Sequence, residues 1–146
     1  MKLKRYRIQF GLCFLFAAAT VAAFVSMRLH YEFLEVEWKT YSTEEAQTIV
    51  ESRRPVIVFV SVDWNLTAAA VQRDFKDDWQ VKRALEQAGA VMFYVETTGE
   101  DGMLPDELGS NDVRMTAIVG FSPSAFSAPQ RVDGVFQATD FVRFVH

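Results

Sequence analysis

Residues 56–75, VIVFVSVDWNLTAAAVQRDF, decide the fold of this chain. The run Val56–Val62 is almost entirely β-branched and aromatic, which is typical of a strand buried on both faces. Asp63–Asn65 then forms a polar turn, and the small and apolar residues after it predict a helix through Phe75. A buried strand that turns directly into a helix indicates an α/β layer architecture.

The segments on either side continue this alternation of strands and helices. Residues 36–41 alternate in polarity, as a half-buried strand does. Ser42 and Glu45 fit a capping box at the start of a helix that ends before Pro55. The other expected elements are a helix over 78–87 ended by Gly89, strands over 91–95 and 116–121, a polar connection over 96–111 with a helical turn near 106–108, a loop bracketed by Pro123 and Pro129, an edge strand opening at Arg131-Val132, and a closing helix around 141–145. This order predicts a mixed sheet with helices on its faces.

The chain begins with a basic tail and an apolar segment. Residues 1–7 contain four lysines and arginines, and residues 8–27 contain no charged residue. A helix of about 20 apolar residues spans the hydrocarbon core of a bilayer, which is about 30 Å thick. Because basic flanks stay on the cytoplasmic side, we predict a cytoplasmic tail over 1–7, a transmembrane anchor over 8–27, a connector over 28–35, and one domain over 36–146 on the outer (periplasmic or extracytoplasmic) side.

A cleaved signal peptide is the alternative interpretation of the apolar segment. Small residues at Val21-Ala22-Ala23 resemble a cleavage site. We favour an uncleaved signal anchor in contact with membrane lipid, because apolar residues continue beyond this site through Met27. Both interpretations bring the domain to the cell envelope.

Composition excludes several classes of function. The net charge of −4 combines a basic tail with a distinctly acidic remainder, so the domain has no basic stripe for nucleic acid. Cys13 is the only cysteine, which excludes an internal disulfide, and we expect it to be an apolar packing residue. His30 and His146 are far apart in sequence, so we expect no clustered metal site and no cofactor.

Residues 63–68, Asp-Trp-Asn-Leu-Thr-Ala, resemble the Asp-Trp-Cys-x-x-Cys motif of the thioredoxin-like superfamily, and most closely that of membrane-bound thiol:disulfide reductases. The family also has a cis proline before the strand that follows a long connection. Met115 stands at the proline position when Thr116 is aligned with the threonine that follows it. The likeness covers about 100 residues, and it implies a three-layer α/β fold with a central mixed sheet.

The resemblance places Asn65 and Ala68 at the two cysteine positions. In a redox-active relative the first cysteine lies at a helix N-terminus, where the helix dipole lowers the pKa of its thiol and favours the attacking thiolate. The second cysteine then resolves the mixed disulfide. Asparagine is no efficient nucleophile and alanine has no reacting atom, so we expect no thiol-disulfide exchange. Asn65 is better suited to capping the helix.

Three functions remain open from the sequence. The first is a redox-inactive, membrane-anchored module that binds an envelope polypeptide, without nucleic acid, through the surface of Asp63, Trp64, Asn65, Met115 and Thr116. The second is an enzyme with non-thiol, metal-assisted chemistry in the acidic connection 96–112, where Glu96, Glu100 and Asp101 are candidate ligands without the regular calcium-loop spacing. The third is a purely structural relative without a partner.

Overall fold

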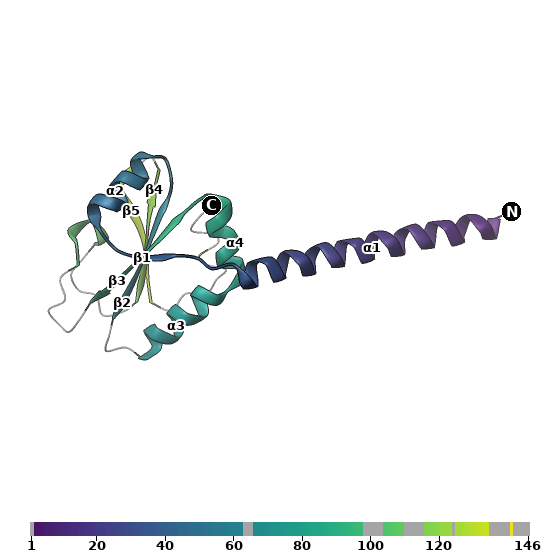
Figure 1. The fold of residues 1–146 in the computed structure, drawn as a ribbon, viewed down its shortest axis with the longest axis horizontal. Helices are drawn as coiled ribbons and strands as arrows, with labels where there is room; N and C mark the ends of the chain where they lie inside the picture. Colours follow the sequence, from purple (N-terminus) through teal and green to yellow (C-terminus); the bar gives the residue numbers. More distant parts are fainter. Residues whose placement is uncertain are drawn as a thin grey trace. The chain divides into compact units, whose positions relative to one another are not determined.

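The computed structural model describes residues 2–62, 66–97, 104–109, 116–123, 125–134 and 141. The chain forms two compact units, Met1–Leu34 and Glu35–His146. The first unit consists of one helix, and the second contains a sheet with helices on both of its faces (Figure 1).

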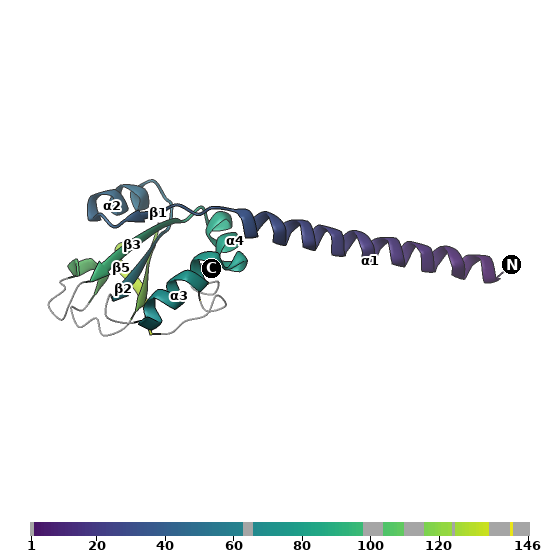
Figure 2. The same ribbon diagram turned by 60° about the horizontal axis from the view of Figure 1, so that its bottom comes forward.

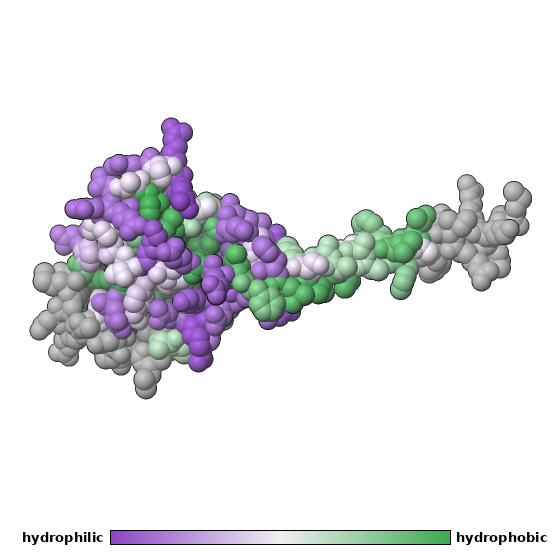
Figure 3. Space-filling view, in the orientation of Figure 1, coloured by the Kyte–Doolittle hydropathy of each residue, from purple (hydrophilic) through white to green (hydrophobic). Residues whose placement is uncertain are grey.

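The first unit is the helix α1 (Lys2–Phe33, 32 residues). Its stretch Gly11–Phe33 is long and apolar enough to cross a membrane, and large apolar side chains such as Phe14 and Phe16 are exposed within the structure. The space-filling view of Figure 3 shows the described part of α1 as predominantly apolar. The helix continues through Phe33, so most of the connector expected over 28–35 is helical.

The second unit contains one five-stranded mixed sheet in the order β1-β3-β2-β4-β5. The strands are β1 (Trp38–Thr40), β2 (Val56–Val62), β3 (Val91–Thr97), β4 (Ala117–Ser122) and β5 (Ala125–Asp133). The helices are α2 (Thr43–Glu51), α3 (Leu66–Asp77), α4 (Trp79–Ala88) and the short 3-10 helix η1 (Asp106–Leu108). Strands β1, β2 and β3 are parallel, and β4 and β5 are antiparallel to their neighbours. Figure 2 shows α2 on one face of the sheet and α3 with α4 on the other.

The alternation of side chains along β2 supplies both halves of the core, as predicted for a strand buried on both faces. Val56, Val58 and Val60 belong to the cluster that includes Ala46 and Val50 of α2. Ile57 and Phe59 belong to the opposite cluster. That second cluster also contains Phe75, Val81, Ala84, Leu85, Met92, Ile118 and Phe141.

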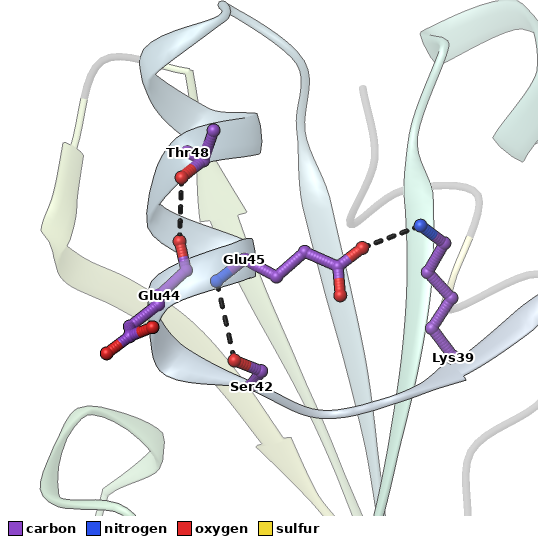
Figure 4. Close-up of polar contacts among 5 residues, drawn as sticks. All are labelled: Lys39, Ser42, Glu44, Glu45 and Thr48. Atoms are coloured by element: carbon purple, nitrogen blue, oxygen red, sulfur yellow. Dashed lines mark hydrogen bonds and ion pairs between the residues drawn. The ribbon is translucent and has the colours of Figure 1, made fainter.

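The helix ends follow the capping signals of the sequence. The Asp78 side chain accepts hydrogen bonds from the first turn of α4, and Gly89 ends that helix in the left-handed conformation. At α2 the Ser42 hydroxyl accepts the Glu45 N–H at 3.5 Å (Figure 4). The reciprocal bond of a capping box is replaced, because the Glu45 carboxylate pairs with Lys39 Nζ at 2.6 Å. The predicted cap therefore forms, with half of the predicted box.

Several predicted boundaries were wrong. β1 begins at Trp38 instead of residue 36, and β3 continues through Thr97 into the predicted connection. The loop expected between Pro123 and Pro129 is largely β5, so the predicted edge strand begins earlier than Arg131. Pro129 is tolerated there because β5 is the edge strand of the sheet, where a missing N–H leaves no neighbouring strand unpaired.

The closing helix expected around 141–145 lies almost entirely outside the described residues. Phe141 is described, and it is helical and buried. Its ring packs edge-on against Phe75 of α3, with ring centroids 4.8 Å apart. The C-terminal residues therefore contribute to the core on the α3 and α4 face.

Candidate functional site

The candidate site is the edge of the sheet at which β1, β2 and β3 end. Ligands of open α/β sheets bind beyond the carboxyl ends of the parallel strands. In the antiparallel pair of β2 and β4, Val60 lies opposite Ala117, the first residue of β4. The chain therefore leaves β2 and enters β4 at the same edge of the sheet. The two predicted site segments, which are far apart in the sequence, are attached to these neighbouring strand ends.

Most of the predicted site residues cannot be placed individually. Outside the described residues lie Asp63, Trp64, Asn65 and Met115. Ala68 belongs to the first turn of α3, and the description there covers the backbone alone. Thr116 directly precedes β4 and is 4% exposed, so it lies at the base of this edge. In the acidic connection, Glu96 is exposed at the end of β3, whereas Glu100 and Asp101 are outside the described residues.

Buried hydroxyl groups line the base of this edge. Ser61, Thr97 and Thr116 are all buried. The Thr97 hydroxyl donates to the Ser61 carbonyl at 3.3 Å, which ties the end of β3 to that of β2. The Thr116 carbonyl accepts the Gly134 N–H at 2.8 Å, which ties the start of β4 to the residue after β5. These bonds satisfy groups that would be costly to bury unpaired.

Tyr94 forms a polar cluster on the α3 face of the same edge. Burial raises the pKa of its hydroxyl, and the nearby Glu96 carboxylate raises it further by charge and by hydrogen bonding. Side-chain hydrogen bonds with Ser61 and with Gln72 of α3 act in the opposite direction. The sequence marked Tyr94 only as part of a buried strand, because nothing in a local pattern predicts which residue of α3 will reach it.

Glu107 of η1 forms a second polar cluster, on the α2 face of the sheet. Its carboxylate accepts a hydrogen bond from the Tyr41 hydroxyl at 3.0 Å and another from the Thr43 hydroxyl. Burial, together with this bond to Glu107, raises the pKa of Tyr41 well above its ordinary value. Burial alone would raise the pKa of Glu107, but hydrogen bonds from Thr43, its own backbone N–H and Tyr41 lower it. Glu107 is therefore held as a carboxylate by two donors that precede it by more than 60 residues.

The groups described at this edge offer hydrogen bonding. They are hydroxyls, carboxylates and one amide, which match the donors and acceptors of a polypeptide. The sequence contains no cysteine besides Cys13, which belongs to α1. Within the described ranges, no group of three His, Cys, Asp or Glu side chains could hold a metal ion.

The lowered pKa of Glu107 predicts an acid-sensitive domain. A carboxyl group whose pKa is lower when folded than when unfolded stabilises the fold above its unfolded pKa, about 4.3. That contribution is lost as the pH falls through the folded pKa. The Glu107→Gln variant should therefore lose less of its free energy of unfolding between about pH 6 and pH 3 than the parent does. Urea unfolding of the full chain in mild detergent, followed by tryptophan fluorescence, measures this difference.

Glu86→Gln is the matched control for this measurement. Glu86 lies on the exposed side of α4 and has no resolved pKa shift, so its variant should follow the parent at every pH. If the Glu107→Gln and Glu86→Gln chains show equal acid sensitivity, the hydrogen bonds from Tyr41 and Thr43 do not control the titration of Glu107.

Comparisons with known proteins place this geometry in a recognised architecture. No protein-family model matches the chain, and no curated protein matches its sequence. Three solved structures share its fold with a TM-score of 0.52 each. "Trxlp" from Edwardsiella tarda EIB202 is 16% identical over 75% of this chain and 98% of its own. A thioredoxin from Thermus thermophilus is 19% identical over 77% and 85%, and a protein described as "DsbH Oxidoreductase" is 14% identical over 77% and 83%.

These identities are low enough that the likeness speaks for the fold alone. The mixed five-stranded sheet, with α2 on one face and α3 and α4 on the other, agrees with the architecture that the motif of residues 63–68 implied. The nearer resemblance to membrane-bound reductases stays a prediction. The chain has the thioredoxin-like fold.

Proposed function

We propose that this chain is a membrane-anchored, redox-inactive thioredoxin-like module that binds a polypeptide of the cell envelope. Its binding surface is the edge of the sheet at which β2 ends and β4 begins, and it includes Trp64, Asn65 and Met115. The single observation that carries the proposal is the pairing of Val60 with Ala117, which brings both segments to one edge.

The chemistry of the two segments supports binding without redox activity. Asn65 and Ala68 stand where the resemblance expects the attacking and the resolving cysteine. Only a thiolate attacks a disulfide, so these residues leave the edge without its reaction. Trp64 and Met115 retain large apolar side chains, which are suited to contact with a polypeptide. A fold that keeps its recognition edge and has no sulfur there is suited to holding a polypeptide without changing it.

The first unit supports attachment of the module to a membrane. α1 could span a bilayer, and its basic residues precede the apolar stretch Gly11–Phe33. Basic residues near the end of a spanning helix favour the cytoplasmic side. This asymmetry supports a cytoplasmic N-terminus and a domain on the outer side of the membrane. A partner would then be a secreted protein or the outer segment of another membrane protein.

Site-specific photo-cross-linking in native membranes tests the proposal. A photo-reactive amino acid is introduced into the full-length chain at Trp64, at Met115 or at Gln87. Gln87 is the matched control, because it is exposed near the end of α4, just before β3 begins, and so lies at the opposite edge of the sheet. We expect one protein to be cross-linked at positions 64 and 115 and not at 87. Equal products at all three positions, or none at 64 and 115, would contradict a binding surface at this edge.

A further inference from the structure

The short helix η1 is fastened by polar contacts from parts of the chain that are distant in sequence. Tyr41 and Thr43, which flank the start of α2, both donate to the Glu107 carboxylate. Tyr41 is itself fixed, because its N–H donates to the Tyr94 carbonyl at 2.9 Å and its ring packs edge-on against Phe93. Two donors from one rigid segment therefore determine where Glu107 lies.

A third fastening comes from Arg131 of β5. Its Nη1 donates to the Leu108 carbonyl at 2.8 Å. The same guanidinium is oriented by Asp133, which accepts from Nε at 2.8 Å and lies 2.7 Å from Nη2. A planar guanidinium held in this way can present its remaining N–H groups in one direction only. Arg131 thus connects the end of η1 to the edge strand.

The residue after η1 is shaped to this contact. Gly109 has a φ of 100°, which a residue with a side chain rarely adopts. A Cβ at Gly109 would lie 2.8 Å from Arg131 Nη1. The close approach of the backbone to the guanidinium therefore requires glycine. From Gly109, the chain reaches Thr116 at the start of β4 and passes Met115 on the way.

Apolar burial does not explain these contacts. Leu104 and Leu108 are buried in the core on the α2 face, and this burial holds η1 against the sheet. Hydrophobic contact is not directional, so it would tolerate small rotations and shifts of η1. Charge-assisted hydrogen bonds are directional and strong. The three fastenings therefore fix the position of η1 more narrowly than its buried leucines require.

We propose that Glu107 and Arg131 are positioning residues for the polypeptide-binding edge, because they fix the point from which the chain leads to Met115 and Thr116. This inference rests on the proposed function. It assigns a role to two residues that the motif resemblance does not include. Neither residue touches the partner. Each acts through η1 and the chain that follows it.

Cross-linking yields from two positions test the inference. In full-length chains in native membranes, Glu107→Ala should lower the yield from position 115 by about tenfold, in the range that small misplacements produce. The yield from position 64, which is attached to β2 and α3, should stay unchanged. Glu107→Gln keeps an accepting oxygen and should restore the yield at 115, and Glu86→Ala is the control for loss of a carboxylate. A purely structural role would lower both yields together, and unchanged yield at 115 in Glu107→Ala would overturn the inference.

Tyr41→Phe provides a milder variant, in case Glu107→Ala fails to fold. It removes one donor to Glu107 and keeps the ring that packs on Phe93, and it should lower the yield at 115 alone. If no product forms at 64 or 115 in the parent, the proposed function fails, and amide hydrogen exchange of the purified full chain decides the inference separately. Glu107→Ala should then exchange at least about tenfold faster over 104–109, with β2 unchanged, as expected for local opening. Equal exchange in the Glu107→Ala and Glu86→Ala chains would overturn it.

Discussion

The Asn65→Cys and Ala68→Cys double variant is expected to reduce disulfides, whereas the parent chain is not. Asn65 immediately precedes α3, which begins at Leu66. A thiol there lies at a helix N-terminus, where unpaired N–H groups and the helix dipole lower its pKa and favour the thiolate. A cysteine at 68 follows at a spacing of three residues, which brings it to the same side of the first turn. It can therefore resolve the mixed disulfide, and repeated turnover becomes possible.

Reduction of insulin by dithiothreitol measures this gain. The Cys13→Ala background removes the single native thiol, which is exposed on α1, and should itself be inactive. In that background we expect the double variant to accelerate insulin precipitation by at least about tenfold, a change that corresponds to only about 1.4 kcal/mol of activation free energy. The matched control is Asn65→Cys with Ala70→Cys, whose second thiol lies at a spacing of five residues and faces away from the first.

The outcome separates the fold from the motif. A variant that folds and reduces insulin supports the assignment of residues 65–68 to the family's redox position. A well-folded variant that stays inactive, with a melting temperature close to that of the parent, would mean that these residues do not occupy that position. The control pair tests whether any two cysteines near the start of α3 are sufficient.

The features predicted correctly from the sequence depend on local interactions. Asp78 and Gly89 specify the ends of α4 through hydrogen bonds and backbone conformation within a few residues. The apolar run of β2 indicates a strand buried on both faces because its side chains alternate between the two core clusters. Such signals lie in one stretch of chain, so no knowledge of the tertiary structure is needed to interpret them.

The features that escaped prediction depend on contacts between distant elements. Pro129 suggested a loop, but whether a proline is tolerated in a strand depends on whether that strand lies at an edge, which the whole sheet decides. Tyr41 and Glu107 are 66 residues apart, and no local pattern predicts their hydrogen bond. The predicted site residues followed from a family motif, whereas the polar clusters of Tyr94 and Glu107 required the structure.

Removal of residues 2–34 is expected to transfer the chain from the membrane fraction to the soluble fraction. α1 leaves large apolar side chains exposed, with Leu12, Phe14 and Phe16 each more than 60% accessible. Water-soluble proteins rarely expose contiguous apolar surfaces of this kind, and insertion of a spanning helix is effectively irreversible. The remainder, Glu35–His146, is a compact unit with its own core clusters. It should therefore stay folded without the helix.

Extraction of membranes at alkaline pH, followed by immunoblotting, measures this partition. The full chain should stay in the pellet, and the shortened chain should appear in the supernatant. Leu15→Arg with Ala19→Arg is the matched variant, because it keeps the length of α1 and places two charges near the middle of the apolar stretch. Each charge near the centre of a spanning helix costs about 2.5–3.5 kcal/mol on insertion scales, so this variant should also leave the pellet. N-terminal sequencing of the mature full chain separates the two interpretations of the segment: an intact start supports the anchor, whereas a start just after Ala23 would identify a cleaved signal peptide. A full chain recovered in the supernatant with its N-terminus intact would contradict both, since α1 would then be an exposed apolar helix without a bilayer.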